Sequence, residues 1–413
     1  MSFSCRLERI WTGFTLESLY KNNMANFLGY NIDIQVQDAD FDIFPTEVVI
    51  ELEDNIHSFY NTARLGVNDP TGILREYGLF TRGAPVSIAI SREDIEQNDF
   101  NSYVVQQVKL EDIATPGIIS GDLHVSLIHS FRAQQQIASA AFEGELSAFV
   151  EQLIAEADFR ETSIESTAFQ RIWYRPLWTP EHTIRKLLPE AFSLDASLTS
   201  FFAFVDSANV FHFESFETLW GTTETMELVY QPETPETTSS KTISEIYPVE
   251  PNFGNLQEGI LFRSFSFAKE GTAVEEEDFA LADSGSAAGS SPFVSTTSDP
   301  TLYDFEWTKD AEEKRKARAA QALLPALFAE RYIVRLPLNA QLTSGKTITL
   351  STLHLSENGR EFSPVTSGKF LVESSKHRWN GPEKTGETTL LLTRPRVSYP
   401  SNYLVGEKVY NGE

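Results

Sequence analysis

The residues able to do chemistry in this chain are few and widely spaced. Its 413 residues include seven histidines and one cysteine. The histidines show no HExxH or HxH spacing and have no partner cysteines, so the sequence predicts no metal site. These histidines are His57, His124, His129, His182, His212, His354 and His377.

Catalytic nucleophiles lack the patterns that would activate them. There is no glycine-rich phosphate loop and no GxSxG turn, and Cys5 has no evident activated setting. The sequence does not decide whether two acids form a pair suited to glycoside cleavage, because the separation of two carboxylates is a three-dimensional quantity. We therefore expect a protein that is not an enzyme and binds no cofactor.

The chain is strongly acidic. It has 33 Lys and Arg against 59 Asp and Glu, a net charge of −26. Such a protein repels nucleic acid as a whole, which disfavours a DNA-binding role. A single cysteine excludes an internal disulfide and is compatible with assembly in the cytosol. No apolar run has the length of a signal-peptide core or a membrane span, so we expect cytoplasmic synthesis and no direct membrane insertion.

An aromatic stretch at the centre of the chain predicts a β-hairpin. In 197–220, SLTSFFAFVDSANVFHFESFETLW, Phe202 and Phe204 alternate with smaller residues, and Phe211 and Phe213 resume the pattern after an Asp-Ser-Ala-Asn segment. Alternation with a period of two on both sides of turn-forming residues is typical of two strands joined by a tight loop. So many aromatic side chains indicate a well-packed hairpin.

The amino-terminal part predicts an antiparallel sheet. Apolar and polar residues alternate in 32–36, 48–52 and 85–91, and further strands are expected at 102–110 and 121–131. A succession of short alternating strands is typical of an antiparallel barrel or sandwich.

Acidic residues gather on the polar faces of these strands. From Asn31 to Phe100 there are 14 acids against 4 arginines, a net charge of −10. A solvated outer face explains most of this charge. The sharper alternative is the wall of an aqueous channel, past which a polyanion slides without sticking. The candidate channel-lining acids are Glu47, Glu51 and Glu53.

Two helices are predicted between the strands and the hairpin. Apolar residues recur at spacings of three and four between Ala141 and Ala157, which places one apolar stripe on a helix. A second helix opens at Thr179, which can cap it, with a proline in the first turn, and Pro189 ends or bends it. The stripe of the first helix comprises Phe142, Leu146, Phe149, Val150, Leu153 and Ile154.

Beyond the hairpin the composition changes to that of an acidic, loop-rich insertion. Segments 222–240 and 284–300 are dense in Thr, Ser, Glu, Pro and Gly, as linkers are. From Gln231 to Pro300, 12 acids face 3 bases, a net charge of −9. Only 260–267 has the pattern of a strand.

The carboxyl-terminal part predicts a helix and then a second β unit. A helix at 310–331 carries the basic cluster Lys314, Arg315, Lys316 and Arg318, which we interpret as a solvated face with ordinary salt pairs. A contact with an acidic neighbouring subunit stays open. Strands are expected at 331–338, 346–354, 368–377 and 387–394.

Two of these regions resemble the baseplate hub proteins of contractile phage tails. The order of the helix in 177–192 and the hairpin with Phe211, His212 and Phe213 is similar to the core of that family. Segment 367–396, SGKFLVESSKHRWNGPEKTGETTLLLTRPR, is similar to its closing hairpin. The residues that carry the second match are Gly368, Lys369, Leu371, Val372 and His377. Neither motif is catalytic, and we interpret His212 and His377 as hydrogen-bonded structural residues.

The resemblance implies a fold that is α+β and predominantly β. It consists of two tube-type antiparallel β-barrel domains built from discontinuous segments, with helical and loop insertions. The implied divisions are a first tube-like barrel in 1–135 completed by 196–230, a helical segment in 136–195 packing on the barrels, an acidic loop-rich insertion and helix in 231–330, and a second tube-like barrel in 331–413.

The resemblance also implies a function and partners. Such a protein forms a homotrimeric ring that joins the hexameric tail tube protein to the trimeric spike protein, contacts other baseplate proteins and meets DNA only in transit through its lumen. It lies in the virion tail baseplate after assembly in the host cytoplasm. Two alternatives remain: the spike base of a bacterial contractile injection or secretion apparatus, and a hub-associated cell-wall-degrading enzyme with a lytic domain in 231–331.

Overall fold

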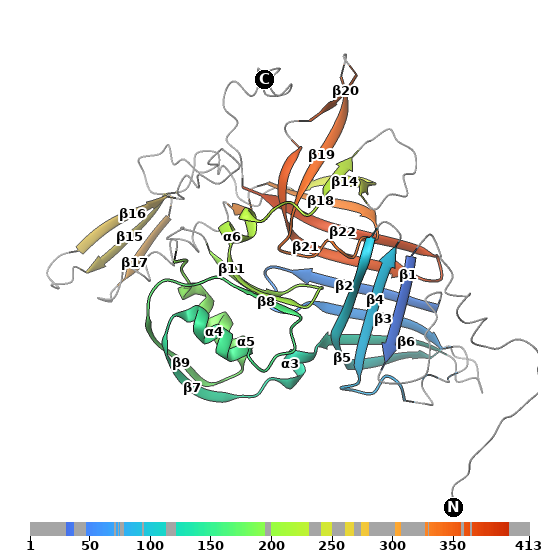
Figure 1. The fold of residues 1–413 in the computed structure, drawn as a ribbon, viewed down its shortest axis with the longest axis horizontal. Helices are drawn as coiled ribbons and strands as arrows, with labels where there is room; N and C mark the ends of the chain where they lie inside the picture. Colours follow the sequence, from blue (N-terminus) through green and yellow to red (C-terminus); the bar gives the residue numbers. More distant parts are fainter. Residues whose placement is uncertain are drawn as a thin grey trace, which may run out of the picture.

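The structure is a computed structural model of the chain (Figure 1). It describes residues 30–36, 47–69, 72, 74, 78–92, 95–112, 121–194, 200–230, 241–249, 261–267, 274–280, 302–306, 327–328, 330–356, 359–363 and 366–395. Cys5, most of the linker-like segments and the basic cluster of the predicted helix 310–331 lie outside these residues. No helix in the described ranges has the length and apolar character needed to cross a membrane.

Six antiparallel strands of the amino-terminal part curl around one core. Their order in the sheet is β1-β4-β5-β6-β3-β2. Alternate residues point inward, and the predicted inner faces of β1, β2 and β4, which include Ile34, Ile50 and Ile88, are buried as expected. The strands are β1 Tyr30–Val36, β2 Val48–Asn55, β3 Thr62–Asp69, β4 Pro85–Arg92, β5 Ile95–Asp112 and β6 Gly121–His129.

The second β unit is built mainly from the four strands predicted at the carboxyl end. Its core contains Ile348, Leu350 and Phe370, all fully buried. These strands are β18 Glu330–Pro337, β19 Thr347–Ser356, β21 Gly368–Asn380 and β22 Thr385–Arg394, with the short β20 Gly359–Phe362 paired to β19. Strands β12 Glu227–Tyr230, β13 Thr242–Ile243 and β14 Glu245–Val249 join the same unit.

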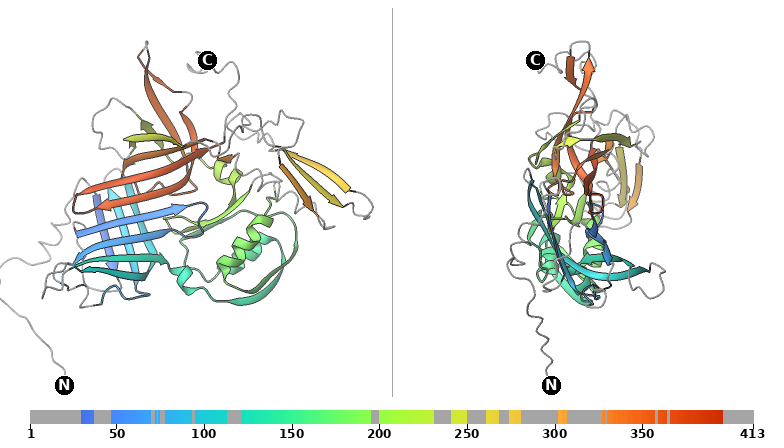
Figure 2. Two further views of the ribbon diagram at one scale, coloured as in Figure 1. Left: turned by 180° about the vertical axis from the view of Figure 1, so that it is seen from behind. Right: turned by 90° about the vertical axis from the view of Figure 1, so that its right-hand side faces the viewer.

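The two units share one continuous sheet, which Figures 1 and 2 show as blue strands followed by red ones. The carboxyl-terminal half of β21 pairs with β2, and its amino-terminal half pairs with β19. A register shift between Val372 and Ser374 lies between these two halves. A bulge bends a strand and increases its twist, so β21 can pair with β2 in one unit and with β19 in the other.

A layer of helices and short strands lies beside the sheet. It contains α3 Ser130–Gln134, β7 Ala138–Gly144, α4 Leu146–Ile154, β8 Glu161–Ile164, β9 Arg171–Trp178, α5 Pro180–Leu187 and the 3-10 turn η2 Leu188–Glu190. The start of α5 is confirmed, since Thr179 accepts a hydrogen bond from the amide of His182.

The first helix is shorter than the apolar spacing predicted. Residues 138–144 form β7, which pairs with β9, and α4 begins only at Leu146. Gly144 has φ +151° and Glu145 is extended, so a helix cannot continue back through them. Phe142 nevertheless stacks on Phe149 with ring centroids 5.4 Å apart, so it packs against the apolar face of α4 from the neighbouring strand.

The central hairpin is confirmed. Strands β10 Phe201–Val205 and β11 Val210–Ser215 pair in antiparallel register, and the short helix α6 Phe216–Gly221 follows. The turn closes with Asn209 at φ +62°, a conformation that asparagine tolerates. All five residues of β10 are buried, because the helical layer covers one side, while Phe328 and His57 contact Phe202 on the other.

The central hairpin pairs outside the large shared sheet. It forms a separate three-stranded sheet in the order β10-β11-β8, and only one backbone hydrogen bond, from Val205 to Phe59, links β10 to the segment between β2 and β3. A further sheet contains β16 Val274–Ala280, β15 Leu261–Phe267 and β17 Leu302–Glu306 in that order. Strand β15 confirms the strand expected at 260–267.

Candidate functional site: a buried polar junction

The sheet, the hairpin and the second β unit meet at one buried carboxylate. Asp54 follows Val48, Ile50 and Leu52 on the inner face of β2 and is 1% exposed. It accepts hydrogen bonds from the backbone amides of Ser207 at 2.8 Å, Ser344 at 3.2 Å and Ser375 at 3.2 Å. The hydroxyl of Ser375 also donates to it. One side chain therefore connects the hairpin turn, the loop between β18 and β19, and β21.

The position of Asp54 has an electrostatic cost. Burial raises its pKa above the ordinary value, and the nearby charge of Asp206 acts in the same direction. Hydrogen bonds from Ser375 and Ser207 act against this shift. Because backbone amides can only donate, the site requires acceptor oxygens from Asp54, and removal of its charge would leave these amides with a weaker partner.

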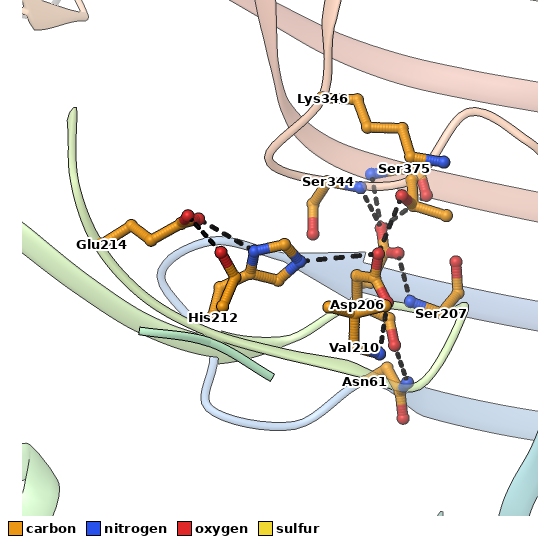
Figure 3. Close-up of polar contacts among 12 residues, drawn as sticks. Asn61, Asp206, Ser207, Val210, His212, Glu214, Ser344, Lys346 and Ser375 are labelled. Carbon is orange, nitrogen blue, oxygen red and sulfur yellow. Dashed lines mark hydrogen bonds and ion pairs between the residues drawn. The ribbon is translucent and has the colours of Figure 1, made fainter. Parts of the chain in front are cut away.

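Asp206 forms a second connection across the same interface (Figure 3). One of its carboxylate oxygens accepts the Val210 amide at 2.9 Å, which closes the hairpin turn. The other accepts the hydroxyl of Thr343 at 3.0 Å. Its backbone carbonyl accepts Asn61 Nδ2 at 2.6 Å. The turn is thus fixed to the loops on both sides of it.

His212 lies between two acids. In Figure 3 its ring points to Glu214 on one side and Asp206 on the other: Nδ1 lies 3.0 Å from Glu214 Oε2, and Nε2 is 3.7 Å from Asp206 Oδ2, an ion-pair distance. The ring also stacks on Phe204 with centroids 4.6 Å apart. Burial alone would lower the pKa of His212, but the two acids together raise it to about 9. His212 therefore carries a proton at neutral pH.

His377 is in the opposite electrostatic state. It is 1% exposed, its Nδ1 lies 3.0 Å from the hydroxyl of Thr388, and its Nε2 lies 3.3 Å from the hydroxyl of Ser375. Burial, with the positive charge of Lys346 nearby, lowers its pKa to about 4. His377 is therefore neutral at neutral pH and supports the Ser375 hydroxyl that donates to Asp54.

A buried ion pair lies where the bulge of β21 occurs. Glu373 is 3% exposed and accepts Arg331 Nη2 at 2.9 Å and His57 Nε2 at 3.0 Å. His57 precedes β3, whereas Arg331 lies on β18. The pair is a second polar link between the two β units.

The residues of the two sequence motifs converge on this junction. Phe211 and Phe213 are fully buried on β11, on either side of His212. Leu371, Val372 and His377 are buried on β21, whereas Gly368 and Lys369 begin that strand. The two motifs are therefore in indirect contact, since His377 reaches Asp54 through Ser375 and Asp54 holds the hairpin turn. The prediction that both histidines are hydrogen-bonded agrees with these contacts.

The three candidate channel acids lie on the outward face of the sheet. Glu47 and Glu51 line a groove of about 510 Å³ over β2, β3 and β6, which Arg64 and His124 also line. Glu51 lies 3.6 Å from Lys376 Nζ and 3.7 Å from Arg378 Nε, and Glu53 is the register partner of Lys376. The acids thus face neighbouring cations. That this face lines a channel stays a prediction.

Sequence reasoning missed the acids that organise the junction. Asp54 is one of the 14 acids between Asn31 and Phe100, and it shares the parity of Leu52 and Ile50 in β2, which is the sequence signal for its burial. The sequence around Asp206 predicts only a turn, and no sequence pattern marks Glu373. Among the described residues, no group of three or more His, Cys, Asp or Glu is arranged to hold a metal ion.

Solved structures of other proteins have a similar fold. A tail protein from Neisseria meningitidis MC58 matches with a TM-score of 0.56 and 8% identity, over 89% of this chain and 97% of that one. The 43 kDa tail protein of prophage MuSo2 from Shewanella oneidensis matches with a TM-score of 0.54 and 9% identity, over 89% and 98%. This chain has the fold of phage tail proteins.

A third solved structure shares this fold. A chain of the Francisella PdpA–VgrG complex matches with a TM-score of 0.51 and 8% identity, over 90% of this chain but 59% of its own length. Neither a protein-family model nor a curated protein sequence matches this chain. The resemblance predicted from the two motifs and the predominantly β fold class are thus confirmed at the level of the fold.

Proposed function

We propose that the protein is a structural hub of a phage tail baseplate. In this role three copies form a ring that joins the hexameric tail tube to the trimeric central spike. The observation that carries the proposal is the shared fold along nearly the whole length of two tail proteins. The role involves no catalysis, and the ring acts in the virion tail after assembly in the host cytoplasm.

The junction gives this role a physical basis. A ring that connects two other assemblies must keep its subunits rigid under load, and a hinge between the two β units would prevent this. Here one sheet runs through both units, and the buried Asp54, Asp206 and Glu373 bind their loops together. Hydrogen bonds from a buried carboxylate to several distant segments favour one arrangement of those segments.

The lumen of the ring belongs to the same proposal. DNA passes through it in transit, and the outward face of β2 with Glu47, Glu51 and Glu53 lines it. The overall charge of −26 supports passage without binding. The pairing of Glu51 with Lys376 and Arg378 makes this face mixed in charge, so it repels a polyanion less strongly than a purely acidic face would.

A spike-base role in a secretion apparatus is the second candidate. The match to a chain of the PdpA–VgrG complex favours it. The match covers only 59% of the length of that PdpA–VgrG chain, whereas it covers 97% and 98% of the two tail proteins. The tail role is therefore preferred.

Coexpression tests the proposal. The tagged chain is produced with the tube protein and the spike protein of the same tail, together and one at a time. We expect both to copurify with the chain in a complex that sediments as one species. Retention of neither protein by the folded chain would contradict the hub role.

A further inference from the structure

The buried polar junction contains several side-chain atoms without a hydrogen-bond partner. Nine buried side-chain nitrogen and oxygen atoms of the described residues have none, and five of them belong to residues at or facing this junction. Native proteins satisfy most such atoms with protein groups or with internal water, because an unsatisfied buried atom is costly. The five atoms are Asn61 Oδ1, Tyr103 Oη, Ser207 Oγ, His212 Nε2 and Ser344 Oγ.

Tyr103 faces the junction from the core of the first β unit. It lies on β5 and is 1% exposed. Burial raises the pKa of Tyr103, and the charges of Asp54 and Asp206 act in the same direction, so the hydroxyl keeps its proton and can donate it. The hydroxyl nevertheless makes no hydrogen bond to either carboxylate. It is therefore close enough to feel both charges but beyond hydrogen-bond distance, and polar contacts of that length are commonly bridged by water.

The two carboxylates can accept further hydrogen bonds. Asp54 Oδ2 accepts the amide of Ser207, and each carboxylate oxygen of Asp206 accepts one hydrogen bond. A carboxylate oxygen can accept two, so both side chains have capacity left. Ser207 and Ser344 donate their backbone amides to Asp54 (Figure 3), so their hydroxyls lie beside the same carboxylate.

The chemistry of these groups indicates which ligand they bind. The hydroxyls of Tyr103 and the two serines need an acceptor for their protons, whereas Asn61 Oδ1 and the carboxylates need a donor. Water both donates and accepts, while a metal ion can satisfy only the acceptors. Among the described residues, no group of three or more His, Cys, Asp or Glu is arranged to hold a metal ion.

We propose that enclosed water bridges the hydroxyl of Tyr103 to the carboxylates of Asp54 and Asp206. The hydroxyls of Ser207 and Ser344 bind the same enclosed water. Strand β5 then joins β2, β21, the hairpin turn and the loop between β18 and β19 in one polar network. This water site belongs to the single folded chain, so it does not depend on the hub role.

Removal of single hydroxyls distinguishes a hydrated junction from a dry one. Tyr103→Phe and Ser344→Ala each delete one unpartnered hydroxyl and leave the rest of the side chain in place. In a dry junction the hydroxyl contributes only its desolvation cost, so its loss would leave the midpoint of thermal unfolding unchanged or raise it. In a hydrated junction the water loses a partner, and we expect each midpoint to fall by roughly 2 °C. Tyr174→Phe, which deletes an exposed hydroxyl of β9, is the control and should not change the midpoint.

A high-resolution crystal structure of the whole chain locates the water directly. We expect a water molecule within hydrogen-bond distance of the Tyr103 hydroxyl and of Asp54 or Asp206. The same structure of Tyr103→Phe should show this water displaced or less well ordered. A wild-type structure in which the Tyr103 hydroxyl binds a protein group directly, or has no water beside it, would overturn the inference. Unchanged or raised midpoints in both Tyr103→Phe and Ser344→Ala would also overturn it.

Discussion

The carboxylate of Asp54 on β2 accepts the backbone amide of Ser207, which lies in the turn of the central hairpin, at 2.8 Å. The two residues are 153 positions apart in the chain. The same carboxylate binds Ser344 and Ser375, so the hairpin is held against the shared sheet through one buried charge. The stability of the junction should therefore depend on Asp54 more than on any acid of the outer face.

Substitution of Asp54 tests this dependence. Asp54→Asn is nearly isosteric but replaces one acceptor oxygen with a donor group. In one orientation of the amide this group opposes the backbone amide of Ser207, and in the other it opposes those of Ser344 and Ser375. We expect the free energy of unfolding to fall by about 2 to 4 kcal/mol, measured by urea denaturation. The matched control is Glu53→Gln, one residue earlier on the exposed face, which should change it by less than about 0.5 kcal/mol. Equal effects of the two substitutions would contradict the role of the junction.

His212 makes the fold sensitive to alkaline pH. Its pKa is raised from 6.5 when unfolded to about 9 in the fold, so the protonated form is the one that the fold stabilises. That stabilisation is complete below about pH 6.5 and is lost as the pH rises through 9. We expect the free energy of unfolding of the wild type to decline over this range by up to roughly 3 kcal/mol. His212→Gln should be less stable at pH 6.5, and its free energy of unfolding should change less between pH 6.5 and 9. Parallel pH profiles of the two proteins would show that the ion pairs do not contribute.

His377 should produce the opposite slope on the acidic side. Its pKa falls from 6.5 when unfolded to about 4 in the fold, so the unfolded chain takes up a proton first as the pH drops. The folded state is therefore favoured above about pH 6.5 and loses up to roughly 3 kcal/mol as the pH falls to 4. His377→Ala should lower stability at pH 7 and weaken assembly. Loss of a peptidoglycan-hydrolysing activity in this variant would instead identify an enzyme.

The outward acids of β2 give a prediction about DNA. Reversal of Glu47, Glu51 and Glu53 to Lys adds positive charge beside Lys376 and Arg378, and each added phosphate contact strengthens salt-dependent binding. The wild-type ring should bind duplex DNA negligibly at about 0.15 M salt, where screening acts over roughly 8 Å, and the triple Lys variant should bind measurably in a filter or anisotropy assay. The corresponding Gln variant controls for lost ion pairs. Tight binding by the wild type would mean that these acids are ordinary surface charge.

Local sequence patterns predicted the elements of this fold well. Alternation identified β2, β4 and the central hairpin, and the Thr179 cap fixed the start of α5. Each of these signals depends on neighbours within a few residues. The helix predicted from Ala141 begins only at Leu146, because residues 138–144 pair as strand β7 with β9 despite their apolar spacing.

Local sequence patterns do not predict which distant strands pair. Residue Glu51 pairs with Arg378, more than three hundred positions later, and nothing in either strand specifies that partner. For the same reason the donors to Asp54 could not be predicted, since they come from three distant segments. What the sequence did contain was the inward parity of Asp54, and an acid at an apolar position of a strand is a signal for a buried, hydrogen-bonded carboxylate.

The mass and symmetry of the purified protein, measured by light scattering and by electron microscopy alone and after addition of the spike protein, test the hub assignment most directly. A ring hub buries extensive surface between identical subunits, so the protein should reach three times the 46.4 kDa of one chain and show threefold symmetry with a central opening. A stable monomer at all concentrations, with no trimer after the spike protein is added, would contradict it.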